Sequence, residues 1–305
     1  MNRREFKIGT GLLAGFAIIA TAAAAQTASK KAAPQQTAPA QTAAAQTASA
    51  AAAAELSLTR LDCGKTTTLK DQNLSLFSDV AAFKGLSVQL TFSCYLVKHG
   101  NDYLVWDTGN PVATGTAPAP TAPTTSLVEQ LAQLHLKPEQ VTFVGISHYH
   151  GDHIGQVASF PQATLLIGKG DWDALNDPKP NPMIKPENFA HWISGGGKVD
   201  PVSGDKDVFA DGSVIMLNTP GHTPGHHSLL VKLKDKGNVL ITGDLAHFQE
   251  NYDSNGVPIF NTNRADTLAS LDRFKQLATN LHATVIIQHD ARDIDKLPAF
   301  PASAK

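Results

Sequence analysis

The segment Ser147-His148-Tyr149-His150-Gly151-Asp152-His153 places four metal-ligand candidates within six residues. It follows an apolar stretch at 141–146 that has the composition of a strand, and it leads into a predicted helix at 153–159. His148 and His150 point the same way if the alternation of the strand continues, and Asp152 and His153 can face a second point across the turn. Neutral imidazoles and carboxylates are ligands that zinc-type cations prefer.

Three more candidates stand just past the ends of other predicted strands. His222 follows the strand at 214–217, Asp244 comes just after the strand at 239–242, and His289 follows the strand at 284–287. A lone histidine is more often a surface or core residue than a ligand. Seven candidate ligands gathered at strand ends, however, predict a metal site.

Composition excludes several classes of protein. The chain has 305 residues, 42% of them hydrophobic and 17% charged, which fits neither a disordered chain nor a polytopic membrane protein. A formal net charge of −2 gives no electrostatic reason to expect nucleic acid or an anionic membrane as a partner. The two cysteines, Cys63 and Cys94, are far apart in the sequence, and we expect them to remain unbridged.

The N-terminus has the parts of a secretory signal. Arg3 and Arg4 precede an apolar stretch that ends in small residues, and the pair resembles the twin-arginine export signal. We expect the twin-arginine machinery to export the protein to the periplasm or beyond and residues 1–25 to be cleaved, leaving no stable membrane association. The alternative is an N-terminal membrane anchor. Cleavage would remove three basic residues and one acidic residue, so the formal net charge would become −4.

The rest of the chain divides into a spacer and one domain. Residues 26–55 are rich in Ala, Gln and Thr and predict a disordered spacer, whereas residues 56–305 are long enough for a single α/β domain. Helices are predicted at 125–135, 153–159 and 264–281, the last with Asn263 as its cap. Strand order cannot be derived from the pattern. The predicted strands are 88–97, 103–106, 141–146, 163–167, 214–217, 227–233, 239–242 and 284–287.

Several motifs together resemble the metallo-β-lactamase-fold hydrolases, and most closely the N-acyl homoserine lactonases, which open the lactone ring of bacterial quorum signals. The resemblance covers most of residues 56–290. The motifs are Ser93-Cys94-Tyr95-Leu96-Val97, Leu104-Val105-Trp106-Asp107-Thr108-Gly109, the HxHxDH segment 148–153, the TPGHTPGHH block 219–227, Gly243-Asp244 and Gln288-His289-Asp290. The HxHxDH motif identifies only the superfamily, and the TPGHTPGHH block and the Cys-Tyr-Leu run favour the lactonases.

The resemblance implies an αββα sandwich and two divalent cations, zinc being favoured and cobalt, manganese or iron being alternatives. One cation would bind His148, His150 and His222, the other Asp152, His153 and His289, with Asp244 bridging them. A hydroxide shared by the two cations would attack the lactone carbonyl, and Asp152 would carry a proton to the leaving alkoxide. No cofactor other than metal is indicated, and a homodimer is compatible with the sequence.

Two positions near these motifs have more than one interpretation. The family usually has tyrosine three residues after the bridging aspartate, whereas this chain has His247, which either hydrogen-bonds the substrate in its place or is a solvated loop residue. Asp107 either orients a ligand imidazole or merely begins a turn. We assign structural roles to His226 and His227.

Other hydrolases of the same fold are alternatives to a lactonase. Asp244 argues against a β-lactamase, while a phosphotriesterase or a thioesterase retains that aspartate. A metal-binding protein without turnover would leave Asp152 unexplained as an acid, and a nuclease would need a basic groove. Phe77, Phe83 and Phe92 are candidates for an acyl-chain groove, although aromatic residues are core by default.

Overall fold

The computed structural model describes residues 54–69, 74–113, 121–181 and 184–305. These belong to one compact unit that extends from Ala52 to Lys305. The predicted export signal at 1–25 and all but the last two residues of the predicted spacer lie outside the described residues. Within the described ranges, no helix is both long and apolar enough to cross a membrane.

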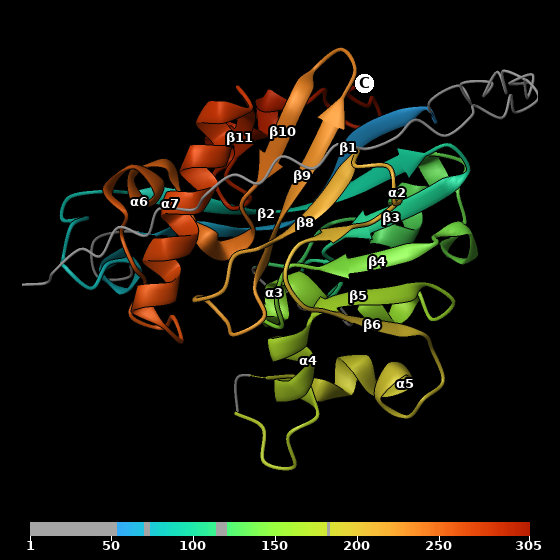
Figure 1. Ribbon diagram of the computed structural model, residues 1–305, viewed down its shortest axis with the longest axis horizontal. Helices are drawn as coiled ribbons and strands as arrows, with labels where there is room; N and C mark the ends of the chain where they lie inside the picture. The colour runs from blue at the N-terminus through green and yellow to red at the C-terminus, as the bar shows by residue number, and fades with distance from the viewer. Residues whose placement is uncertain (1–53, 70–73, 114–120, 182–183) are drawn as a thin grey trace, which may run out of the picture. The chain divides into compact units, whose positions relative to one another are not determined.

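Two mixed sheets form the centre of the fold (Figure 1). In the first, the order is β1-β2-β3-β4-β5-β6, and β3 to β6 are parallel to one another. In the second, the order is β11-β10-β9-β8-β7, and only the β10–β11 pair is parallel. The strands are β1 (Leu56–Leu69), β2 (Val88–His99), β3 (Asp102–Trp106), β4 (Phe143–Ile146), β5 (Thr164–Gly168), β6 (Val199–Val202), β7 (Lys206–Asp207), β8 (Val214–Asn218), β9 (His227–Leu233), β10 (Gly237–Ile241) and β11 (Thr284–Ile286).

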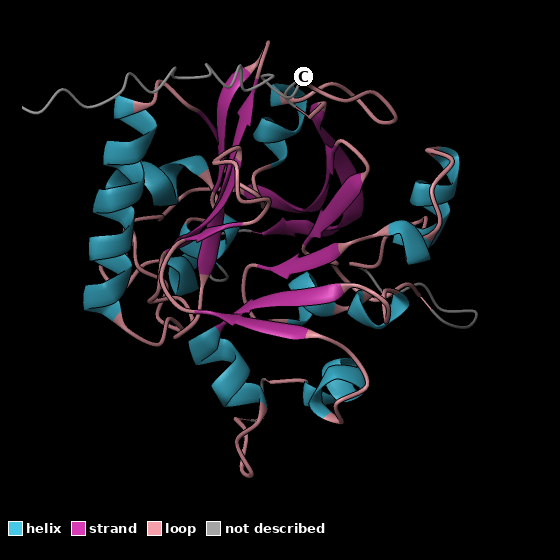
Figure 2. Cartoon of the chain, turned by 45° about the vertical axis from the view of Figure 1, so that its right-hand side comes forward, coloured by secondary structure: helices cyan, strands magenta, loops and turns pink. Residues whose placement is uncertain are grey.

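Helices cover the outer faces of both sheets (Figure 2). Leu127 and Leu131 of α2 and Leu175 of α4 pack on the first sheet, and Leu271 and Phe274 of α7 pack on the second. The α-helices are α2 (Leu127–Gln133), α3 (Gly151–Ile154), α4 (Lys169–Leu175), α5 (Ala190–Ile193), α6 (Gln249–Ser254) and α7 (Arg264–Asn280). The 3₁₀ turns are η1 (Ser75–Phe77), η2 (Pro138–Gln140), η3 (Val157–Ser159), η4 (Pro186–Phe189), η5 (Gly243–Leu245) and η6 (Ala291–Lys296).

The main core lies between the two sheets, because each sheet buries its inner face against the other. Side chains from both sheets contribute to it, among them Tyr95, Val97, Leu104, Trp106, Met216, Leu229, Val231, Val239, Ile241 and Ile286. The arrangement is therefore an αββα sandwich, and the predicted fold class is confirmed. Burying both faces of each sheet explains why the strands appear in the sequence as continuous apolar runs.

The sequence predicted eight of the strands within a few residues and missed β1, β6 and β7. The cap of α7 is confirmed: the Asn263 side chain accepts hydrogen bonds from the amides of Ala265 and Asp266. The helix predicted at 153–159 is wrong as one element, since α3 ends at Ile154 and the separate turn η3 follows.

The prediction about the cysteines is also wrong. Cys63 on β1 and Cys94 on β2 form a disulfide, with a Cα–Cα distance of 5.9 Å. β1 pairs antiparallel with β2, and Leu61 stands opposite Cys94 just before a bulge in the register. Residues distant in the sequence therefore lie side by side, at a separation that a disulfide can span.

Candidate metal centre

The predicted ligands all lie in the segments that follow strands, Asp152 and His153 within the short helix α3 and Asp244 within η5. β4 leads into the segment 147–153, β8 precedes His222, β10 precedes Asp244 and β11 precedes His289. Since β8, β10 and β11 run in the same direction, their C-terminal ends meet at one edge of the second sheet. The loop after β4 reaches this edge from the first sheet, so the centre lies where the two sheets meet.

A first group consists of His148, His150, His222 and Asp244. The Nε2 atoms of His148 and His222 lie 3.1 Å apart, and Nδ1 of His150 lies 2.9 Å from each of them. Burial lowers the pKa of His148 well below its ordinary value and lowers the pKa of His150 to about 3. These imidazoles are therefore neutral at pH 7, the form that binds a metal.

A second group consists of Asp152, His153 and His289. The Nε2 atoms of the two histidines lie 3.1 Å apart, and Oδ2 of Asp152 lies 3.8 Å from His153 and 3.7 Å from His289. Burial opposes charge on both rings, yet the carboxylate of Asp244 raises the pKa of His153 and His289. The surroundings of this group thus favour a positive charge.

Asp244 connects the two groups. Its Oδ2 lies 3.2 Å from Nε2 of His222 and 3.5 Å from Nε2 of His148. Its Oδ1 lies 2.7 Å from Nε2 of His289 and 3.1 Å from Nε2 of His153. Although burial opposes ionisation, the surrounding histidines lower the pKa of this carboxyl well below its usual value. One ionised carboxylate therefore presents a different oxygen to each group.

Outer partners decide which ring nitrogen carries the proton in each histidine. Nδ1 of His222 lies 2.8 Å from Oδ1 of Asn261, and Nδ1 of His289 lies 2.8 Å from the carbonyl oxygen of Thr91. Because these oxygens only accept, each Nδ1 must donate and each Nε2 presents a lone pair when the ring is neutral. Neither partner stands in a recognisable motif, so the sequence pattern does not predict them.

The hydrogen bonds of His148 also fix which of its ring nitrogens carries the proton, and they show that the first group fits a cation. The Ser147 hydroxyl lies 2.8 Å from the Asp107 carboxylate and donates to it, so the hydroxyl oxygen accepts from Nδ1 of His148, 3.1 Å away. When both rings are neutral, His148 and His222 consequently direct two Nε2 lone pairs at each other across 3.1 Å. Two lone pairs at that distance repel unless a cation lies between them, and the donor set therefore fits a divalent metal ion.

The remaining predicted residues lie around these groups. Asp107 accepts from Nδ1 of His153 at 2.8 Å, the place of an aspartate that orients a ligand imidazole. His226 accepts a hydrogen bond from the amide of Asp244 at 2.9 Å, and His227 contacts the carbonyl oxygens of Gly225 and Gly204. Neither His226 nor His227 belongs to a ligand group.

His247 is buried rather than solvated. Its Nε2 lies 3.1 Å from Oδ2 of Asp244, and its ring meets the edge of Phe77 at a centroid distance of 4.8 Å. Burial lowers the pKa of His247, so its ring is neutral at pH 7 and retains an N–H donor.

A pocket of about 330 Å³ opens onto both ligand groups. Phe77 and Phe92, two of the predicted groove residues, line it, whereas Phe83 packs against Phe248 instead. The apolar residues Leu90 and Phe260 also line it and were missed. The complete lining is Phe77, Leu90, Phe92, His150, Gly151, Asp152, Asp244, His247, Phe260 and His289.

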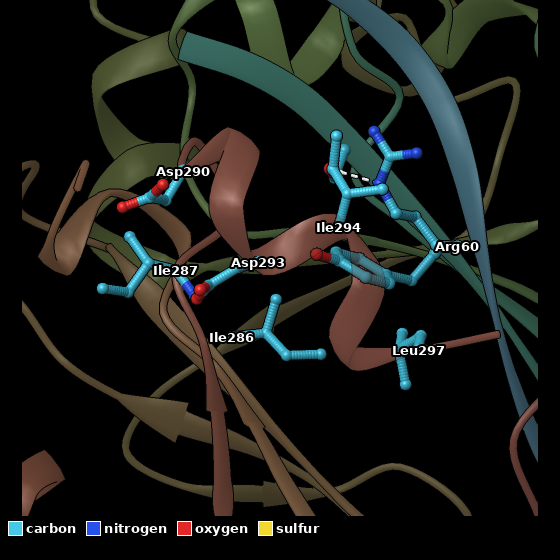
Figure 3. Close-up of a pocket in the computed structure, with 9 residues that line it drawn as sticks. Arg60, Ile286, Ile287, Asp290, Asp293, Ile294 and Leu297 are labelled. Carbon is cyan, nitrogen blue, oxygen red and sulfur yellow. Dashed lines mark hydrogen bonds between the residues drawn. The ribbon is translucent and has the colours of Figure 1, made fainter. Parts of the chain in front are cut away.

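The loop that carries His289 is held from behind by η6 (Figure 3). The Asp293 carboxylate accepts a hydrogen bond from the amide of Ile287 at 2.7 Å, and Asp290 accepts one from the amide of Gln249 at 2.8 Å. Arg60, Ile286 and Leu297 close this region, which leaves no free volume for a ligand. It therefore supports the centre and is not a second site.

Comparison with known proteins identifies relatives of known activity. N-acyl homoserine lactonase AttM of Rhizobium radiobacter is 27% identical over 248 residues, covering 72% of this chain and 90% of that protein. The N-acyl homoserine lactonase of Bacillus cereus is 26% identical over 230 residues, covering 71% of this chain and 88% of its own length.

Solved structures agree with the fold. A quorum-quenching N-acyl homoserine lactone lactonase matches with a TM-score of 0.68 at 24% identity, covering 82% of this chain and 98% of that one. AidC, a dizinc quorum-quenching lactonase, matches with a TM-score of 0.59 at 22% identity, covering 82% and 90%. The sequence pattern of the Metallo-beta-lactamase superfamily matches residues 92–289. The chain belongs to the metallo-β-lactamase superfamily.

Proposed function

We propose that this protein is a hydrolase that opens the ring of N-acyl homoserine lactones or related lactones with two divalent cations, zinc being favoured. The observation that carries the proposal is the position of Asp244, whose two oxygens face two separate ligand groups beside one pocket. Relatives named as N-acyl homoserine lactonases, matched over about nine-tenths of their length, support the choice of substrate.

The two ligand groups would hold one cation each. Divalent cations bound there supply a hydroxide nucleophile at neutral pH and polarise the substrate carbonyl. Asp244 fixes the spacing between the groups because it contacts both. Asp152, whose side chain is 31% exposed and lines the pocket, is placed to pass a proton to the departing alkoxide. His247 also lines the pocket, and its Nε2–H, which now lies 3.1 Å from Asp244, would turn to the substrate once Asp244 holds the cations.

The rest of the pocket suits an uncharged substrate with an apolar tail. Phe77, Leu90, Phe92 and Phe260 provide an apolar wall opposite the polar groups of the centre. Among the described residues, no Lys or Arg lines the pocket, so these side chains offer no cation to bind a phosphate or a carboxylate. A lactone with an acyl chain presents the carbonyl to the centre and the chain to the wall.

The decisive experiment compares hydrolysis rates of the purified protein. The substrates are a homoserine lactone series with different acyl chains, a cephalosporin, paraoxon and a thioester. We expect kcat/KM to be highest for a lactone. Lactone turnover no faster than that of the other three substrates would contradict the proposed substrate class.

The two-cation part has a separate test. Asp244→Asn removes the charge that both groups share, so metal content should fall and kcat should drop by orders of magnitude. Unchanged metal content and rate in this variant would contradict the dinuclear centre, whatever the substrate. Asp211→Asn, at an exposed carboxylate paired with His99 on the surface, is the control and should leave both quantities unchanged.

We further propose that the protein works in the periplasm or outside the cell. The twin-arginine-like start at Arg3 and Arg4 supports export, and so does the disulfide between Cys63 and Cys94, since such bonds persist in oxidising compartments. Replacing both arginines by lysine should retain the protein in the cytoplasm, as measured by cell fractionation. Unchanged export would contradict a twin-arginine route.

A further inference from the structure

A buried carboxylate outside the ligand groups joins the two loops that supply the first group. Asp171, in the first turn of α4, has no exposed surface. Its Oδ2 accepts hydrogen bonds from the amide of Tyr149 at 3.1 Å and from the hydroxyl of Thr223 at 2.8 Å. Its Oδ1 accepts one from the amide of Gly225 at 2.7 Å.

The three donors identify what this carboxylate holds together. Tyr149 stands between His148 and His150 in the loop after β4 of the first sheet, and Thr223 directly follows His222 in the loop after β8 of the second sheet. Among the described residues no continuous β-ladder joins the two sheets, although the amide of His227 donates a hydrogen bond to the carbonyl oxygen of Ser147 at 2.8 Å. Asp171 therefore fixes the loops of the two sheets to each other at the position of the three histidines.

The packing around Asp171 leaves it little freedom to move. A Cβ added to Gly168 would lie 1.8 Å from the carbonyl oxygen of Gly225, and one on Gly170 would lie 2.8 Å from that of Pro224. A Cβ on Gly225 would lie 2.4 Å from the amide nitrogen of Asp171. The start of α4 and the loop 223–225 thus touch backbone to backbone, an approach that only glycine permits.

Neither catalysis nor an ion pair accounts for this residue. Asp171 does not line the pocket, and the described residues include no Lys or Arg in a salt bridge with it. A buried carboxylate that receives three hydrogen bonds from two loops is suited to set the distance between them. The quantity it controls here is the separation of His222 from His148 and His150, now 2.9–3.1 Å between ring nitrogens.

We infer that Asp171 is a positioning residue, which holds His148, His150 and His222 at the separation that a cation requires. The inference rests on the proposed metal centre but not on the identity of the substrate. It predicts a selective effect: loss of the carboxylate should weaken the first ligand group more than the second, because Asp152 and His153 lie beyond its contact at Tyr149, in α3, and it makes no hydrogen bond to the loop of His289.

The test is zinc binding by the purified protein after its metal has been removed. Zinc is titrated in competition with a chromophoric chelator, for the wild type and for Asp171→Asn, at a temperature at which circular dichroism shows both folded. We expect the wild type to bind two equivalents, and the variant to lose at least tenfold in affinity for one of them. Asp173→Asn, on the same helix but exposed and paired only with Lys169, should bind like the wild type.

The outcomes separate the hypotheses. If Asp171→Asn binds both equivalents with the affinity of the wild type, the positioning role is contradicted. If the wild type itself binds no zinc or other divalent cation, the proposed centre fails instead. Should Asp171→Asn not fold, Thr223→Val removes one hydrogen bond at nearly constant volume. That variant should weaken the same equivalent about threefold, and unchanged affinity there would also contradict the inference.

Discussion

Nδ1 of His153 lies 2.8 Å from Oδ2 of Asp107, and both side chains are fully buried. Asp107 follows β3 with φ of +57°, a left-handed conformation that few residues other than glycine adopt. The same carboxylate accepts hydrogen bonds from the amide of Ser147 and the side chain of Gln288, each at 2.7 Å. The strained backbone thus delivers a carboxylate that holds the His153 ring with Nε2 turned toward Asp244.

Asp107→Asn should weaken metal binding without removing any ligand. The amide replaces one acceptor oxygen by a donor, so the orientation of His153 or the bond to Ser147 is lost. Replacement of such an outer partner typically costs 10- to 100-fold in metal affinity, and we expect a loss of about that size, measured by chelator competition. Asp102→Asn, at the exposed first residue of β3, is the control. Equal affinity of the two variants would contradict the orienting role of Asp107.

His247→Tyr should keep or raise lactone turnover. The imidazole of His247, through the Nε2–H that now faces Asp244, and a tyrosine hydroxyl can each donate a hydrogen bond to the substrate, whereas phenylalanine cannot. His247→Phe should therefore lower kcat about 100-fold, the usual cost of removing one positioned donor. Both variants should keep the metal content of the wild type. A loss of metal in either variant would make His247 a ligand instead.

The disulfide should contribute substantially to stability. Cys63 and Cys94 are 31 residues apart in the sequence, and closing a loop of that size restricts the unfolded chain by about 3–4 kcal/mol. Replacing both cysteines by serine should lower the free energy of unfolding in urea by about that amount. Reductant should destabilise the wild type and not the variant. A difference below about 1 kcal/mol would show that the unfolded chain gains little freedom when the bond is absent.

The same pair shows where sequence reasoning was insufficient. β1 begins with alternating apolar and polar residues and continues into the polar run Lys65–Thr68, so it lacks the continuous apolar composition that revealed the strands buried on both faces. Without β1, nothing placed Cys63 opposite β2. The gathering of the candidate ligands, in contrast, was predictable because each lies in a segment that follows an apolar strand. Asp171, Asn261 and Thr91 were not, because their roles depend on which loops meet across the two sheets.

Asp171 also makes stability depend on pH. Burial raises its pKa from 3.8 to about 7, against the lowering effect of the bonds from Thr223, Gly225 and Tyr149. Between these values the unfolded chain has released a proton that the folded protein still holds, so raising the pH favours unfolding. The hydroxyl of Thr223 can accept as well as donate, which lets the bonding pattern survive in the protonated form.

We therefore expect the stability of the wild type, relative to Asp171→Asn, to fall by about 1.4 kcal/mol per pH unit from near pH 4 to near pH 7. The measurement is urea unfolding of both proteins at several pH values in this range, in the presence of a chelator. The ligand histidines titrate in both proteins, so their contributions largely cancel in the difference. Parallel stability curves for the two proteins would mean that this carboxyl is already ionised throughout the range, held so by its three hydrogen bonds.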